Sequence, residues 1–281
     1  MPHLRRLIQY GYAPVFFLVT IAGAISVIQN QLSIFWLILL LLVALGVSML
    51  VERLLPYDSE FNQSQGDTGR DVIHAFVNEC VSMGGVLILP LLAFLTPDRE
   101  FWPTEWPISL QLALAIVVAD FGITLAHFAS HKVPVLWRFH AVHHSVKRLY
   151  GFNGLMKHPI HQIIEMIAAA LPLLLLGVPQ EIAYLLAFAT SIQLLLQHSN
   201  VDVRAGYLAN VWAVAPVHRL HHVNRAVDGD CNFGLFTTIW DFMLGTFRPQ
   251  SSFRLKASNI GLEDRQNYPS SYSAQLLEPF R

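Results

Sequence analysis

Three short histidine motifs in the sequence have spacings that suit metal binding. One has the pattern HxxxH (127–131), and two have the pattern HxxHH (140–144 and 218–222). Residues three or four apart share one face of a helix, so the rings of a motif can point at one metal ion, and the adjacent histidine of HxxHH can reach a neighbouring ion. A further histidine, His198, lies at the end of an apolar run. The candidate metal ligands are therefore His127, His131, His140, His143, His144, His198, His218, His221 and His222.

Nine imidazoles exceed what one metal ion accepts, so we expect two ions. Imidazole suits iron, copper, zinc and nickel. A structural zinc site uses four ligands, usually with cysteine, and the two cysteines here, Cys80 and Cys231, are isolated. The HExxH pattern of zinc proteases and the Glu-x-x-His pairs of soluble di-iron bundles are both absent from the sequence. A pair of redox metals remains, and iron that activates O₂ is the preferred interpretation.

Other polar residues are expected to support these ligands. We expect His3 and His74 to be packed or hydrogen-bonded, and the KHPIH segment (157–161) leaves open whether His158 or His161 binds metal directly. No side chain beyond the metal ligands is assigned a catalytic role. The candidates for orienting the rings by hydrogen bonds are Asp120, Glu165, Asp202, Asp228, Asp230 and Asn232.

The elements that position the histidines are apolar helices. The 281 residues are 54 % hydrophobic and only 13 % charged, against about a quarter charged in soluble domains. We expect an all-α, polytopic membrane helical bundle of three apolar hairpins, with about four full spans plus a shorter pair, and a cytosolic histidine-rich cap. The expected spans are roughly 11–29, 32–51, 79–96 and 108–128, and the shorter pair is 163–177 and 181–197.

The distribution of basic residues predicts the orientation. With the N-terminus in the cytoplasm, three hairpins place 17 of the 18 Lys and Arg residues on that side, and only Arg99 on the other. All the histidine motifs then lie on the cytoplasmic side. Trp102 and Trp106 are expected in an interfacial belt. Three parts follow: N-terminal transmembrane hairpins (1–107), a catalytic domain (108–249) and a C-terminal cytosolic tail (250–281).

The stretch from Asp120 to Pro249 resembles the fatty acid hydroxylase / sterol desaturase superfamily. It carries DFGITLAHFASH, LWRFHAVHHS, NGLMKHPIHQIIE, QHSNV, PVHRLHHV and NFGLFTTIWDFMLGTF in order. The first histidine box departs from the common YxWHR-like form, because 123–128 read ITLAHF and lack the arginine. The resemblance implies a helical membrane enzyme with two non-haem irons, using O₂ and external electrons to hydroxylate or desaturate lipids.

We therefore expect hydroxylation of a lipid C–H bond. The sequence leaves open a desaturase on the same site, a metal-binding membrane scaffold or transporter, and a zinc hydrolase of lipid headgroups. It shows no dinucleotide-binding, haem or iron–sulfur motif, so a separate ferredoxin- or cytochrome-type electron donor is expected. The other expected partners are the bilayer and a lipid substrate of unspecified kind. The net charge of −1 suggests no nucleic-acid partner.

Overall fold

The computed structural model describes residues 2–94, 101–224, 226–249, 254–265 and 267–281. Within these residues there are helices and three isolated β-bridges but no β-strand. The expected all-α fold is thereby confirmed. The long helices are α1 (Pro2–Gln29), α2 (Phe35–Leu54), α3 (Thr68–Phe94), α4 (Ile108–Lys132), α6 (Pro159–Leu176) and α7 (Gln180–His198). The shorter ones are α5 (Pro134–His144), α8 (Ala215–His218), α9 (Ala226–Gly229), α10 (Ile239–Leu244) and α11 (Tyr272–Leu277).

Five of the described helices are long and apolar enough to cross a membrane. They provide the candidate spans Arg5–Gln29, Phe35–Leu54, Thr68–Ile88, Ile108–Lys132 and Pro159–Leu176. Together with the family assignment given below, they make the chain a multi-pass membrane protein. The third span differs from the prediction, because α3 begins at Thr68 and not near residue 79. The first turns of α3 are polar, so the apolar run in the sequence begins later than the helix does. Because the span begins at Thr68, Glu79 lies near its middle.

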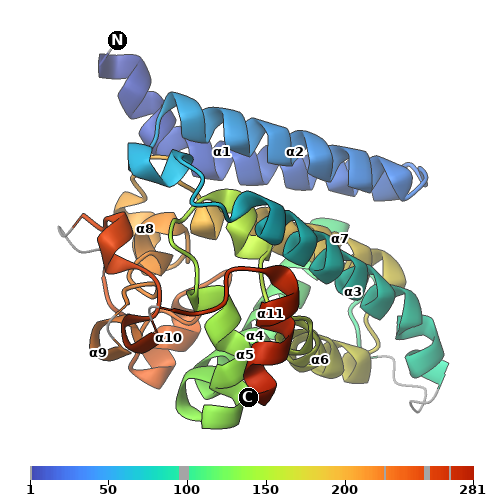
Figure 1. Ribbon diagram of the computed structural model, residues 1–281. Helices are drawn as coiled ribbons and strands as arrows, with labels where there is room; N and C mark the ends of the chain where they lie inside the picture. Colours follow the sequence, from blue (N-terminus) through green and yellow to red (C-terminus); the bar gives the residue numbers. More distant parts are fainter. Residues whose placement is uncertain (1, 95–100, 225, 250–253, 266) are drawn as a thin grey trace.

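Helix α7 forms the centre of the bundle. It packs against α1, α2, α3 and α4, and most of its side chains are buried. Figure 1 shows it beneath the paired helices α1 and α2, with the short helices α8, α9 and α10 gathered beyond its histidine-bearing end. Because α7 is enclosed by protein, it can carry buried Gln193 and Gln197, whose amides bind backbone carbonyls of the segment around Leu235.

Small residues and helix-ending residues set the geometry around α4 and α6. A Cβ atom at Gly122 would collide with the carbonyl of Ala168, so glycine permits these two helices to touch. Gly177 ends α6 in the left-handed conformation at φ 79°, as C-terminal caps commonly do. Pro134 occupies the first turn of α5, directly after Val133 ends α4. The short break turns α5 back towards α4, and this places two histidine motifs opposite each other.

The segment between α3 and α4 is only partly described. Arg99, the one basic residue expected on the far side of the membrane, lies outside the described residues. Trp102 is buried, and its indole N–H donates to Gln111 Oε1 at 2.8 Å. Its expected place on the outer surface, in a belt at the membrane interface, is therefore wrong. Trp106 is exposed.

Candidate metal centre

The structure brings all nine candidate ligands together, in two adjacent groups. Within each group, one nitrogen of every ring lies within 4.8 Å of all the others. The first group is His127, His131, His140, His144 and His221. The second group is His143, His198, His218 and His222.

Helix α5 contributes to both groups. His140 and His144 are four residues apart and face the first group, whereas His143 faces the second. The third motif behaves differently from a regular helix. Helix α8 ends at His218, and turns carry the chain through His221 and His222, which therefore also face different groups.

Backbone carbonyls fix the orientation of several rings. The Nδ1 atoms of His127, His143 and His221 lie 2.8, 2.8 and 2.9 Å from the carbonyl oxygens of Phe233, Met156 and Cys231. A carbonyl oxygen only accepts, so each of these Nδ1 atoms carries the proton and donates it. The opposite nitrogen, Nε2, then presents a lone pair towards the centre of the cluster.

The lone pairs of His127 and His221 face each other without a donor between them, and other ring nitrogens lie close by. The Nε2 atoms of His127 and His221 are 2.9 Å apart, and His144 Nε2 lies 3.0 Å from His221 Nε2. In the second group His218 Nε2 lies 3.2 Å from His198 Nε2. Facing lone pairs repel unless a cation lies between them. A proton is a poor choice, because burial lowers the pKa of His221 well below its ordinary value and that of His143 to about 3. The donor set therefore fits metal ions.

Asp230 orients one further ring. His131 Nδ1 lies 2.9 Å from Asp230 Oδ1, and the same carboxylate pairs with Lys132. The hydrogen bond from His131 is the main reason that the pKa of Asp230 falls to about 2. An ionised carboxylate accepts the Nδ1 proton and directs the Nε2 lone pair of His131 inward.

Two aspartates secure the loop that carries the Phe233 carbonyl. Asp120 on α4 accepts hydrogen bonds from the backbone N–H groups of Leu235, Phe236 and Thr237 at 2.8–3.0 Å. Asp241 accepts from the N–H groups of Phe233 and Gly234 at 2.7 and 2.8 Å. Asp120 was expected to contact a histidine, but it acts on His127 only through this loop.

The remaining orienting candidates lie in different surroundings. Glu165 pairs with Lys157, and its Oε1 lies 3.8 Å from His161 Nε2. Asn232 donates to the carbonyls of Val217 and Arg248, beside the third motif. Asp202 instead accepts hydrogen bonds from Arg5 and Gln9 of α1, and Asp228 lies 3.9 Å from Arg248.

The histidines outside the nine have separate positions. His158 caps α6 by accepting the N–H of Ile160 at 3.1 Å. His161 is buried, and its Nε2 contacts His140 Nδ1 directly, so it touches the cluster from outside. His74 is buried as expected, between the Lys157 carbonyl and Gln275 Oε1. Its contact with α11 shows that the C-terminal tail is anchored beside the site, which the polar sequence of the tail did not reveal.

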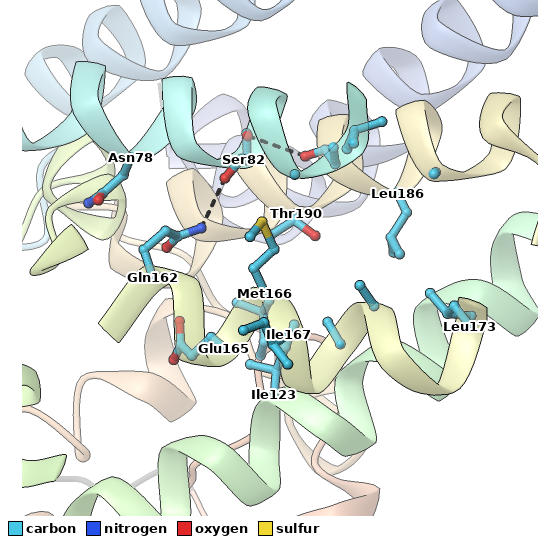
Figure 2. A pocket seen from close by; sticks show the side chains of 18 of the residues that line it. Asn78, Ser82, Ile123, Gln162, Glu165, Met166, Ile167, Leu173, Leu186 and Thr190 are labelled. Carbon is cyan, nitrogen blue, oxygen red and sulfur yellow. Dashed lines mark hydrogen bonds between the residues drawn. The ribbon is translucent and has the colours of Figure 1, made fainter. Parts of the chain in front are cut away.

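An apolar cavity leads to the histidines. It has a volume of about 220 Å³ and is lined mainly by α3, α6 and α7 (Figure 2). A small neighbouring void of about 10 Å³ is lined by His127, His140, His143 and His218. Cavity and void share five lining residues: Ile123, Lys157, Glu165, Leu194 and Leu235. The cavity therefore ends next to both histidine groups.

Comparison with known proteins assigns the family. The family model described as fatty acid hydroxylase matches residues 112–246. Ornithine lipid hydroxylase OlsE of Rhizobium tropici is 32 % identical over 273 residues, covering 92 % of this chain and 80 % of the relative. Alkylglycerol monooxygenase of Danio rerio is 28 % identical over 158 residues, and Delta(7)-sterol-C5(6)-desaturase of Nicotiana tabacum is 29 % identical over 147 residues. These two alignments cover 56 % and 50 % of this chain but only 35 % and 50 % of the relatives. No solved structure matches the chain.

The fold, the histidine cluster and these relatives define a membrane-bound oxidoreductase. The chain belongs to the fatty acid hydroxylase family, within the fatty acid hydroxylase / sterol desaturase superfamily. The resemblance stated from the histidine boxes and the expected enzyme class are confirmed.

Proposed function

We propose that the nine histidines hold two iron ions and that the protein hydroxylates a C–H bond of a membrane lipid with O₂. The observation that carries this proposal is the convergence of nine imidazoles in two adjacent groups at the end of an apolar cavity, with the Nε2 lone pairs of His127 and His221 facing each other.

Iron is favoured over zinc by the ligand chemistry and the relatives. The centre offers neutral imidazoles, and a thiolate is absent from both groups among the described residues. Imidazole suits redox-active iron, and the relatives' names are those of hydroxylases, monooxygenases and desaturases. Bound iron would supply the activation of O₂ that no amino-acid side chain provides.

Hydroxylation is preferred to desaturation because the hydroxylase among the relatives aligns with more of this chain than the desaturase does. Ornithine lipid hydroxylase aligns with 92 % of this chain, whereas the sterol desaturase aligns with 50 %. Desaturation on the same histidines is the alternative. The mass of the product separates the two reactions, since hydroxylation adds one oxygen and desaturation removes two hydrogens.

The cavity accepts substrate from the bilayer. Ile88 on α3 and Ile167 and Leu171 on α6 line the cavity and are also exposed on the apolar outer surface of the bundle. The volume of about 220 Å³ lies below the roughly 300–1,000 Å³ of sites that enclose drug-sized ligands. A flexible alkyl chain suits this space better than a rigid ring system. The apolar lining keeps bulk water from the histidines.

We place the histidine cluster and the N-terminus on the cytoplasmic side, because the histidine motifs lie on the side that is rich in basic residues. Electrons would come from a separate ferredoxin- or cytochrome-type protein that docks there. We retain the proposed division into 1–107, 108–249 and 250–281.

Isotope labelling tests the activity. Membranes that contain the protein are incubated under ¹⁸O₂ with a reducing system, and their lipids are compared with membranes that contain the His143→Ala variant. The proposal predicts lipids that gain 18 mass units only with the unsubstituted protein. Lipids that lose two mass units instead would show desaturation, and an unchanged lipid profile would contradict both.

A further inference from the structure

Glu79 is an acidic residue inside a membrane-spanning helix. It lies one residue from the centre of the span Thr68–Ile88, and it lines the substrate cavity. Ionisable side chains at such depth are costly and usually belong to a functional site. Neither the family's histidine boxes nor the metal centre accounts for Glu79.

Few donors surround this carboxylate. Among the described residues, its hydrogen-bond partner is the hydroxyl of Ser191 on α7, 3.1 and 3.2 Å from its two oxygens. One hydroxyl carries one proton, whereas an ionised carboxylate accepts several hydrogen bonds. Glu79 therefore has unused acceptor capacity, and it lines both this cavity and a smaller one of about 60 Å³ beside α2.

The neighbouring residue has the same deficit. Asn78 also lines the cavity, and its amide group donates to the carbonyls of Leu155 and Lys157 at 2.9 and 3.0 Å. Its Oδ1 atom is buried and has no donor among the described residues. The Oδ1 atom of Asn78 is closed off by protein, whereas Glu79 is half-buried, so Glu79 is the acceptor that a ligand in the cavity can reach.

The charges that line the cavity do not balance. Its described lining contains two carboxylates, Glu79 and Glu165, and one cation, Lys157. Lys157 pairs with Glu165. An ionised Glu79 has no counter-ion among the described lining residues, so the ionised form of the cavity is complementary to a group that carries one positive charge and several donors.

We propose that Glu79, with Ser191, forms a subsite that binds a cationic amino group of the lipid substrate. The inference rests on the proposed function only in assigning the cavity to substrate. An alkylammonium group supplies three N–H donors and the missing charge. Glu79 repels an anionic headgroup, such as a free carboxylate, and an alcohol leaves its charge uncompensated.

The subsite is separate from the metal centre. Ser191 precedes His198 by seven residues on α7, which corresponds to about 10 Å along the helix. Figure 2 shows Asn78, Ser82 and Gln162 on one side of the cavity and apolar Leu173 and Leu186 towards the other. The amino group would bind at the polar side, and an alkyl chain would extend among the leucines.

Binding of simple amphiphiles tests the subsite without turnover. Hexadecylamine, hexadecanol and hexadecanoic acid share one chain length and differ in the polar group. Their dissociation constants are measured by titration calorimetry at pH 7 on the full chain in a neutral maltoside detergent. We expect hexadecylammonium to bind about tenfold or more tightly than hexadecanol, because hydrogen bonds to charged groups are the stronger ones, and hexadecanoate to bind most weakly.

Three variants make the test specific. Glu79→Gln keeps the size of the side chain and should abolish the preference for the ammonium, whereas Glu79→Asp keeps the charge and should retain it. Glu181→Gln is the matched control, because Glu181 is exposed near the start of α7 and should change nothing. Equal binding of the three amphiphiles by the unsubstituted protein, or an unchanged preference in Glu79→Gln, would overturn the subsite.

The iron content of each preparation separates the two proposals. Preference for the ammonium in a protein that binds no iron would support the subsite and refute the di-iron centre. Full iron content without the preference for the ammonium would support the di-iron centre and refute the subsite.

Discussion

The Nε2 atoms of His127 and His221 lie 2.9 Å apart, although the two residues are 94 positions apart in the chain and each ring donates its Nδ1 proton to a backbone carbonyl. The two lone pairs therefore face each other. Their repulsion is relieved only by a cation, and their buried position disfavours a proton. This pair defines the metal centre more sharply than the number of histidines does.

Removing a ring from either group should disable the centre. We expect His221→Ala and His218→Ala each to reduce bound iron and to lower lipid hydroxylation more than about 100-fold, because even residues that only orient ligands are worth 10–100-fold. Iron analysis and product formation measure the effect. His3→Ala is the control, because His3 is exposed on α1 and is not packed, contrary to expectation. Undiminished activity in either cluster variant would show that the ring is not a ligand.

The loop that carries the Phe233 carbonyl should depend on Asp120. Asp120→Asn replaces an acceptor-only group by one whose amide N–H faces backbone donors, so we expect a loss of roughly 1.5–3 kcal/mol in the free energy of unfolding and weaker iron retention. Thermal unfolding in detergent and iron analysis measure the two effects. Asp202→Asn should retain its iron, because the Asp202 carboxylate binds Arg5 and Gln9 of α1 and does not hold the loop that carries the Phe233 carbonyl. Normal iron retention in Asp120→Asn would refute the proposed control of His127 through the loop.

Without metal, the protein should lose stability as the pH falls below about 6.5. Burial lowers the pKa of His143 to about 3 and lowers the pKa values of His140, His144 and His218 well below the ordinary 6.5. Below pH 6.5 the unfolded chain therefore binds more protons than the folded chain. The folded state loses about 1.4 kcal/mol per pH unit for each such histidine. Unfolding temperatures of chelator-treated protein between pH 5 and 8 should decrease towards pH 5; a flat profile would contradict the neutral, buried state of these rings.

The contact between α4 and α6 should not tolerate a larger residue at Gly122. Gly122→Ala introduces a Cβ atom that collides with the Ala168 carbonyl, and overpacking of this kind costs about 1–3 kcal/mol. Gly46→Ala is the matched control, since a Cβ atom there meets nothing within 4 Å. Comparison of their thermal unfolding tests the contact. Equal unfolding temperatures for Gly122→Ala and Gly46→Ala would contradict the close contact between α4 and α6.

Helix periodicity explains why His127 and His131, and likewise His140 and His144, face one group, because residues four apart share a face. It does not explain the positions of His198, which belongs to no motif, or of His221 and His222, which follow the end of α8. It could not reveal what orients the rings. The carbonyls of Phe233, Met156 and Cys231 come from loops, and their positions depend on long-range contacts such as those of Asp120 and Asp241. A backbone carbonyl is present at every residue and leaves no signal in the sequence.

The same limit explains the residues that were missed. Glu79 was taken as the edge of an apolar run, because the polar first turns of α3 do not resemble a membrane helix. His161 contacts His140 only because α6 packs beside α5, although its position four residues before Glu165 indicated a shared face. The segment 250–281 was expected only to form a cytosolic tail, yet the Gln275 side chain in it is fully buried between His74 and Ser145.

Metal analysis combined with Mössbauer spectroscopy on detergent-purified protein loaded with iron-57 tests the central proposal most directly. We predict two irons per chain with the parameters of nitrogen-rich, non-haem sites, and loss of iron in His221→Ala. One zinc ion per chain, or no metal at all, would contradict the di-iron centre and with it the proposed hydroxylation.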